Sequence, residues 1–181
     1  MKKLIMALLF ISTFSLLQGC AAGIADGRTM TEQFDDNALS RAALHKIQEL
    51  NISNTELRIN FLTNSGYLLV VGEVSSQAYL TAIETKLASL KEAKGVYNQL
   101  RIGRPIGFAQ QSKDSWITTQ IKAKFTTNDY IDPFQIKVVT ENSEVFLVGK
   151  ITKEMANVAT NIARNVEGVK LVNRAFQIAD E

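Results

Sequence analysis

The sequence contains an internal repeat, and this feature limits the possible folds more than any other. The stretch ELRINFLTNSGYLLVVGEV (56–74) corresponds to PFQIKVVTENSEVFLVGKI (133–151), without a gap, at an offset of 77 positions. In each stretch two strand-like runs flank a short polar turn, TNSGY or TENSE, which is typical of a β-hairpin. Both copies contain Val-Gly close to their ends, with the glycines at Gly72 and Gly149. The chain therefore predicts two copies of one small fold.

Helical segments flank each predicted hairpin. Before it, apolar residues recur on one face of a helix. These residues are Leu39, Ala43, Ile47 and Leu50 in the first copy, and Ile117, Ile121 and Phe125 in the second. After it come a second helix, with Ser75 or Ser76 and Thr152 as N-caps, and a last strand. The order α-β-β-α-β predicts an α+β fold of two tandem domains, each a three-stranded mixed sheet with two helices on it.

The domain limits follow from where the helical and strand patterns begin and end. We expect domains at residues 35–103 and 113–181, joined by a linker at residues 104–112. The linker contains Gly and Pro, which interrupt regular structure, and its Ile106 and Phe108 are expected to pin it against one domain.

Two details of the helices are also predicted. Asp36 and Asp114 stand at corresponding helix starts, where a carboxylate suits the N-cap position. The interval from Gly72 to Gly95 is four residues longer than the interval from Gly149 to Gly168, so we expect a longer second helix in the first domain.

The chain begins with a segment typical of an export signal. MKKLIMALLFISTFSLLQGC has two lysines, then an apolar run, then small residues and a cysteine. The apolar run is too short and wrongly flanked for a stable membrane span, so a short transmembrane anchor is the weaker alternative. We expect residues 1–19 to be a signal peptide.

Cys20 is the only cysteine, which leaves no partner for a disulfide or a thiol metal site. The ending LQGC resembles a bacterial lipobox, with Gln18 as a departure from the usual pattern. This resemblance implies an N-acyl and S-diacylglycerol lipid on Cys20, and Ala21 after it implies delivery to the outer membrane. Residues 20–34 are predicted to be a flexible, lipidated spacer.

Charge and residue types exclude several function classes. Without residues 1–19 the chain has 18 basic and 18 acidic side chains, so no overall basic field attracts nucleic acid. His45 is the only histidine, which excludes a histidine-rich metal site, and the glycines form no phosphate-binding loop. We therefore expect that the protein is not an enzyme and that it holds no cofactor and no metal. A hydrolase is a distant third hypothesis, behind the two binding functions described below.

The two units resemble paired BON domains, through VVGEV and FLVGKI before the second helix and GVYNQLRI and GVKLVNRAF after it. The lipobox, RPIGF and DSWITT narrow the resemblance to dual BON-domain outer-membrane lipoproteins of the DolP type, over nearly the whole chain. The resemblance implies a non-enzymatic, periplasm-facing lipoprotein that supports outer-membrane integrity. It also implies contact with anionic phospholipid through the first helix of the second domain, and accumulation at division sites.

The only tryptophan, Trp116, lies off the apolar face of that helix. With Ile117 at 0° and about 100° per residue, Phe125 falls near 80° and Trp116 near 260°. The matching residue of the first copy is Ala38, so the fold does not require a tryptophan here. The candidate phospholipid-binding residues on or beside this face are Trp116, Thr119, Gln120, Lys122, Ala123, Lys124 and Thr127.

Alternatives to the phospholipid hypothesis remain open at this point. Trp116 can instead pack at the seam between the domains, or under the linker with Phe108. The runner-up function is a non-enzymatic adaptor that docks an envelope-assembly or cell-wall-remodelling protein. Solvent exposure of Trp116 separates a surface role from burial at the seam.

Overall fold

The computed structural model describes residues 30–179, and it contains the predicted α-β-β-α-β order twice. The first unit consists of α2 (Met30–Gln48), β1 (Leu57–Asn64), β2 (Tyr67–Val74), α3 (Gln77–Ala88) and β3 (Gly95–Ile102). The second unit consists of α4 (Phe108–Thr126), β4 (Lys137–Glu141), β5 (Glu144–Ile151), α5 (Lys153–Arg164) and β6 (Leu171–Ile178).

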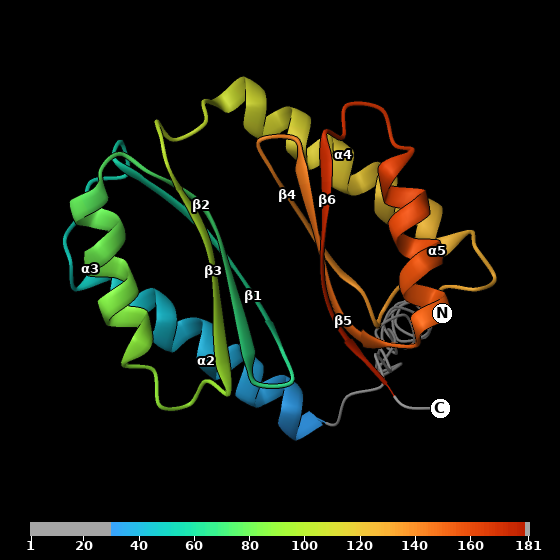
Figure 1. Cartoon of the computed structure of the whole chain (residues 1–181), viewed down its shortest axis with the longest axis horizontal. Coiled ribbons are helices and arrows are strands. Elements are labelled where there is room, and N and C mark those ends of the chain that lie inside the picture. Colours follow the sequence, from blue (N-terminus) through green and yellow to red (C-terminus); the bar gives the residue numbers. More distant parts are fainter. Residues whose placement is uncertain (1–29, 180–181) are drawn as a thin grey trace, which may run out of the picture.

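Each unit forms a three-stranded mixed sheet, which confirms the predicted fold class. In the first sheet β2 lies in the middle, antiparallel to β1 and parallel to β3. In the second sheet β5 takes the same place between β4 and β6. The helices cover one face of each sheet, α2 and α3 on the first and α4 and α5 on the second (Figure 1). Ser76 and Thr152 cap α3 and α5 as predicted.

Both hairpins close with a two-residue turn. Asn64 is paired with Tyr67 across the first turn, and Glu141 with Glu144 across the second. The two residues inside each turn have a positive φ, between 51° and 85°. This backbone geometry matches the twist of the flanking strands and suits the Gly, Asn and Ser that occupy it.

An aspartate from the first helix of each unit holds the turn. Asp36 accepts hydrogen bonds from both turn N–H groups of the first hairpin, at 3.0 and 2.8 Å. Asp114 accepts the corresponding pair in the second hairpin, both at 2.8 Å. The predicted N-cap roles are therefore wrong, because both aspartates lie inside their helices and bind a distant turn.

The first helices start earlier than predicted. Residues 30–34, assigned to the spacer from sequence, belong to α2, and residues 108–112, assigned to the linker, belong to α4. Gly107 is the N-cap of α4 and makes no side-chain capping bond. Phe108 does not pin a linker, because it lies in the first helical turn and is 84% exposed.

The second helices have equal length, which contradicts the prediction of a longer α3. Both α3 and α5 contain 12 residues. The two glycines used as markers are not equivalent, because Gly95 begins β3 whereas Gly168 lies in the loop before β6. Gly168 has a φ of +86°, a left-handed conformation that glycine adopts without strain.

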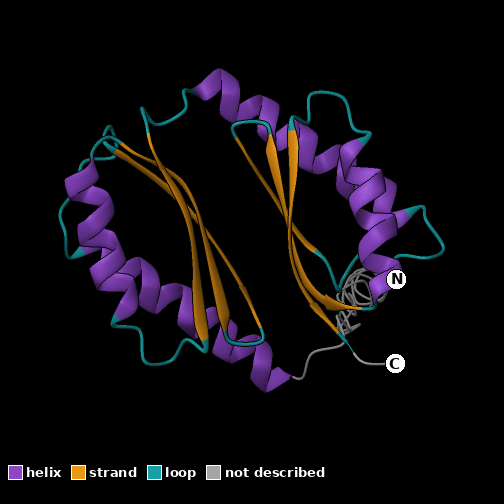
Figure 2. Cartoon of the chain, viewed as in Figure 1, coloured by secondary structure: helices purple, strands orange, loops and turns teal. Residues whose placement is uncertain are grey.

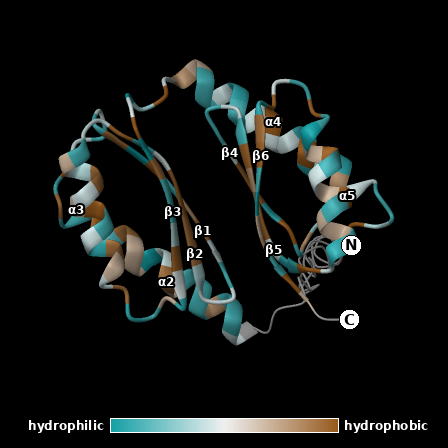
Figure 3. Ribbon diagram, viewed as in Figure 1, coloured by the Kyte–Doolittle hydropathy of each residue, from teal (hydrophilic) through white to brown (hydrophobic). Residues whose placement is uncertain are grey.

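Each unit has its own hydrophobic core between its sheet and its helices. The predicted residues Leu39, Ala43 and Ile47 of α2 are buried in the first core. Ile117, Ile121 and Phe125 of α4 are buried in the second, each at most 1% exposed. Figure 3 shows hydrophobic residues along the strands of both sheets and also a hydrophobic first turn of α4.

The two sheets pack against each other through the faces that their helices leave uncovered. The centre of this contact is a third apolar cluster of Leu62, Leu69, Val71, Phe146 and Val148. The layers therefore follow the order helices, sheet, sheet, helices (Figure 2). Strand residues at alternate positions serve the two faces, because side chains of a strand point alternately to opposite sides.

Polar contacts surround that apolar centre. At one end, Glu141 accepts hydrogen bonds from Arg58 Nε at 2.7 Å and Asn60 Nδ2 at 2.6 Å. Nearby, the Arg101 guanidinium binds both carboxylate oxygens of Glu144. These contacts join strands of the first unit to strands of the second, so they fix the two units relative to each other.

Candidate membrane-contact site

Trp116 lies on the outer surface of α4, away from both cores. Its side chain is 48% exposed. The neighbouring Ile117 is 0% exposed, so the helix turns one large apolar residue inward and the next outward. Neither burial at the seam nor burial beneath the connection between the units is observed for Trp116.

The other predicted phospholipid-binding residues share this surface to different degrees. Gln120 is half-buried, whereas the remaining members are exposed: Thr119, Lys122, Ala123, Lys124 and Thr127. Thr118 of the same helix hydrogen-bonds Thr140 of β4 at 2.8 Å. The α4 surface is thus a continuous exposed stripe that extends from Trp116 toward the end of the helix.

Hydroxyl groups on this stripe are already used by the helix. Thr119 Oγ1 donates to the Ser115 carbonyl at 2.9 Å, and Thr127 Oγ1 donates to the Lys124 carbonyl at 3.2 Å. A phosphate needs donors, and a hydroxyl that donates to the backbone offers only its lone pairs. The lysines, the tryptophan N–H and the half-buried Gln120 amide are therefore the donors that this surface offers to an anion.

The charge of α4 is unevenly distributed. Lys113, Lys122 and Lys124 are exposed, and within residues 30–179 none of the three has an ion-pair partner. The only acid of the helix, Asp114, is 3% exposed and bound to the hairpin turn. The exposed surface of α4 is consequently cationic without a nearby acid on the same helix.

One exposed apolar residue was missed as part of this surface. Phe108 precedes Trp116 by eight positions, which places the two roughly 80° apart around the helix. Both are exposed, Phe108 at 84%. The sequence signal was present as a phenylalanine followed by helix-forming residues, but the Gly-Pro context favoured a loop.

A polar hollow of about 310 Å³ adjoins the end of the stripe. Its lining combines the end of α4 with one side of α5: Lys124, Thr127, Asn128, Asn161, Ile162 and Asn165. Lys124 and Thr127 belong to both the stripe and the hollow, so a group bound beside α4 has access to these amides.

Other titratable groups form no catalytic arrangement with the candidate site. His45 is largely exposed on α2 and lies 3.3 Å from Glu49. Glu73 and Glu141 are buried between the sheets, where burial and repulsion by Glu141 raise the pKa of Glu73 to about 7. Within residues 30–179, no group of His, Cys, Asp and Glu side chains is arranged to hold a metal ion.

No helix within residues 30–179 is both long enough and apolar enough to span a bilayer. Cys20, the predicted lipidation site, lies outside the described residues.

Comparison with known proteins places these features in a family. The BON domain family matches residues 113–180. Outer membrane lipoprotein DolP of Haemophilus influenzae is 34% identical over 175 residues, which cover 91% of each chain. The 21 kDa hemolysin of Actinobacillus pleuropneumoniae is 35% identical over 147 residues, which cover 81% of this chain and 76% of the relative.

A solved structure gives a weaker likeness. The C-terminal domain of CdsD, a structural protein of the type III secretion system of Chlamydia trachomatis, is 14% identical, with a TM-score of 0.33. The match covers 78% of this chain and 98% of that one, and it supports no conclusion about this protein. The sequence match over 91% of the chain and the BON domain match show that this chain belongs to the DolP family of BON-domain outer-membrane lipoproteins.

Proposed function

We propose that this lipoprotein binds anionic phospholipid through the exposed surface of α4 and thereby supports outer-membrane integrity. The observation that carries the proposal is the exposure of Trp116, at 48%, on a helix whose predicted core residues are fully buried. Members of the family are not known as enzymes. A binding function therefore agrees with both the surface and the family.

The chemistry of the surface suits the interface of a bilayer. An indole ring has a large apolar body and one N–H donor, and tryptophan is enriched at the level of lipid head groups for this reason. Phe108 adds a second exposed aromatic ring at the start of the same helix. Lys122 and Lys124 supply positive charge further along the same helix, which favours anionic over neutral lipid.

The corresponding helix of the first unit lacks this combination. Ala38 replaces the tryptophan, and α2 carries Glu32 and Asp35 in its first two turns. Lys46, at the position that corresponds to Lys124, lies 3.6 Å from Glu49. Acidic groups repel anionic lipid, so the proposal assigns the contact to the second unit alone.

The expected affinity is low for the protein domains alone. Burying the exposed part of one tryptophan contributes about 2–3 kcal/mol, and each lysine near an anionic surface about 1 kcal/mol. The sum corresponds to a dissociation constant between roughly 1 mM and tens of micromolar. A chain already tethered through a lipid on Cys20 needs no higher affinity, because the tether makes the second contact intramolecular.

A vesicle-binding experiment tests the proposal. Purified protein without the lipid on Cys20 is mixed with vesicles of phosphatidylethanolamine and phosphatidylglycerol, and the bound fraction is measured by co-sedimentation. We expect Trp116→Glu to reduce binding at least tenfold. Leu44→Glu is a matched control, because Leu44 is 47% exposed on α2, and it should bind like the unmodified chain. Equal binding of Trp116→Glu and Leu44→Glu would contradict the proposal.

Salt dependence gives a second readout. Lys122→Gln with Lys124→Gln should weaken binding severalfold at low salt and flatten its dependence on ionic strength, because screened charge contacts are removed. A photo-crosslinker at position 116 that captures one defined protein, with no vesicle binding, would favour the adaptor function instead. Accumulation at division sites, which the family resemblance implies, is checked by microscopy of the tagged chain.

A further inference from the structure

A cleft of about 320 Å³ lies between the two sheets, on the side where β3 and β6 form the outer strands. This volume falls within the range of small-molecule sites, roughly 300–1,000 Å³. The cleft is separate from α4 and is lined entirely by strand residues and by the end of the first hairpin. The α4 surface and this cleft are therefore two independent features.

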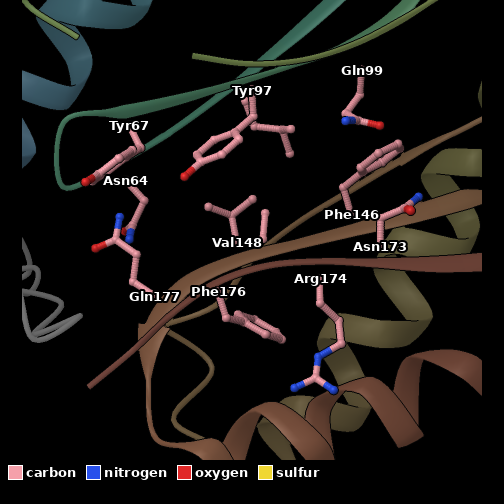
Figure 4. A pocket seen from close by; sticks show the side chains of 12 residues that line it. Asn64, Tyr67, Tyr97, Gln99, Phe146, Val148, Asn173, Arg174, Phe176 and Gln177 are labelled. Atoms are coloured by element: carbon pink, nitrogen blue, oxygen red, sulfur yellow. The ribbon is translucent and has the colours of Figure 1, made fainter. Parts of the chain in front are cut away.

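The cleft combines aromatic rings with uncharged amides. Tyr67 and Tyr97 stack with ring centroids 6.0 Å apart, and Tyr97 is 54% exposed. Leu69, Phe146 and Val148 supply apolar surface between the sheets. The amide side chains at the cleft are Asn64, Gln99, Asn173 and Gln177 (Figure 4).

Asn64 is the residue that most directly indicates a ligand in this cleft. It is 4% exposed, and its Nδ2 has no hydrogen-bond partner within residues 30–179. A buried donor without a partner is unfavourable, and native structures seldom retain one without a reason. In Figure 4 the amides of Asn64 and Gln177 lie at the same end of the cleft, beside the ring of Tyr67.

Comparison of the two units shows how the Asn64 end of the sheet contact differs from the opposite end. In the second unit, the residues equivalent to Asn64 and Tyr67 are Glu141 and Glu144, which bind Arg58 and Arg101. Those ion pairs close the sheet contact at that end. At the Asn64 end the equivalent positions carry the neutral Asn64 and Tyr67, and the charged pair on that side, Lys137 with Asp36, lies outside the lining of the cleft.

We propose that this cleft binds a short uncharged oligosaccharide. Amide side chains donate and accept at once, which matches neighbouring hydroxyl groups of a sugar. The electron-rich faces of Tyr67 and Tyr97 suit the C–H edges of a sugar ring. A ligand oxygen that reaches Asn64 Nδ2, a buried donor at the wall of the cleft, supplies the acceptor that residues 30–179 do not.

Competing ligand classes fit less well. An anion would need a cation in the cleft, but Arg174 points away from it, over the ring of Phe176 (Figure 4). An acyl chain would leave the amides unsatisfied. An extended peptide is recognised through an exposed strand edge, whereas this cleft is lined by the faces of the two sheets.

The test uses the mature lipidated chain in a detergent without sugar groups. Saturation-transfer NMR measures binding of two probes, chitotetraose and maltotetraose, with tetraalanine as the peptide comparison. We expect transfer to at least one oligosaccharide and none to tetraalanine. Trp116→Glu should leave this binding unchanged, which separates it from phospholipid contact.

Variants locate the site. Tyr97→Ala and Gln99→Ala should each weaken oligosaccharide binding at least tenfold. Tyr130→Ala is the matched control, because Tyr130 is an exposed tyrosine outside the cleft, at 68%, and it should bind normally. Asn64→Leu should lose binding while the melting temperature of the free protein stays equal or rises, a combination that a purely structural asparagine does not give.

Three results would overturn the proposal. The first is no saturation transfer to either oligosaccharide. The second is full binding by Tyr97→Ala and Gln99→Ala, which would place the sugar elsewhere. The third is transfer to tetraalanine that is lost in the same variants, which would identify the cleft as a peptide site.

Discussion

The two repeats share the residues that hold the fold and differ in those that they expose. Asp36 and Asp114 bind the same turn in each unit, and both are almost fully buried. At the neighbouring surface position, the first unit has Ala38 and the second has Trp116. The shared aspartates therefore serve the fold, and Trp116, which only the second repeat has, is the residue to which we assign the proposed contact.

The two units also fill their cores differently, because large side chains come from different helices in each unit. On the first helices, Ala43 and Ile47 correspond to the larger Ile121 and Phe125. On the second helices the order reverses, because α3 buries Ile83 and Leu87 whereas α5 buries mainly alanines. Close packing tolerates such exchanges when the total volume is kept. One backbone arrangement thus accommodates two different distributions of side chains.

Substitution of the glycine in the Val-Gly step that the two repeats share is expected to give the largest loss of stability. A Cβ on Gly72 would lie 2.0 Å from the Arg58 carbonyl oxygen, and φ at Gly72 is +142°. A Cβ on Gly149 would lie 2.3 Å from the Gln135 carbonyl oxygen. We expect Gly72→Ala and Gly149→Ala each to lower the free energy of unfolding by roughly 3–5 kcal/mol, with Gly72→Ala the more severe.

Chemical denaturation followed by circular dichroism measures both changes. Gly107→Ala is a suitable control, since a Cβ there meets nothing within 4 Å. A loss below about 1 kcal/mol for either strand variant would show that the strands can separate locally without penalty.

Substitution of Asp36 or Asp114 is expected to give the next largest loss of stability. Asp114→Ala leaves two turn N–H groups without their acceptor and removes one of the two acceptors of Gln110 Nε2, so we expect a loss of about 3 kcal/mol. Asp36→Ala should cost a similar amount and also weaken the contact between the sheets, because Lys137 of β4 lies 4.0 Å from Asp36. Asn substitutions keep one acceptor oxygen and should cost less. Equal stability of the Ala and Asn variants in denaturation would contradict this role.

Glu73 has no acidic equivalent in the second unit, and its substitution is expected to have the smallest effect on stability. Burial raises its pKa to about 7, above the value of an exposed glutamate, so the folded state binds the proton more tightly than the unfolded state. Stability should therefore fall as pH rises from about 4.5 to 7. Lys150, the equivalent residue of the second unit, is exposed. Glu73→Gln should stabilise the fold at pH 8, by on the order of 2 kcal/mol, and change little at pH 4.5.

Denaturation curves at pH 4.5, 6 and 8 check this prediction. Glu92→Gln, at an exposed loop position, provides the control and should leave the pH profile unchanged. If Glu73→Gln keeps the slope of the unmodified protein between pH 4.5 and 7, another group must carry the proton linkage.

Sequence patterns were sufficient for the elements and both cores. The hairpin offset and the spacing of Ile117, Ile121 and Phe125 depend on local periodicity, which a single sequence shows directly. The N-cap roles of Asp36 and Asp114 failed for a physical reason. A carboxylate near an expected helix start looks the same whether it binds its own helix or a turn about 30 residues away.

The candidate surfaces were predictable only in part. The outward direction of Trp116 follows from helical geometry, and the structure agrees with it. The cleft between the sheets was not predictable, because Asn64 and Gln177 are brought together by the packing of two units that sequence periodicity treats separately. Alternation along a strand shows that a side chain points away from the core of its own unit. It does not show which residues that side chain contacts on the other face of the sheet.

The back-to-back sheets have a consequence for how the molecule stands on a bilayer. Layers of helices and sheets are spaced about 10 Å apart, so α2 and α4 lie on opposite outer sides, roughly 30 Å from each other. When α4 rests on lipid, the first unit is raised above the head groups and its helices α2 and α3 face away from them (Figure 1). With the proposed contact, one side of the molecule meets the membrane and the other side is presented to the periplasm.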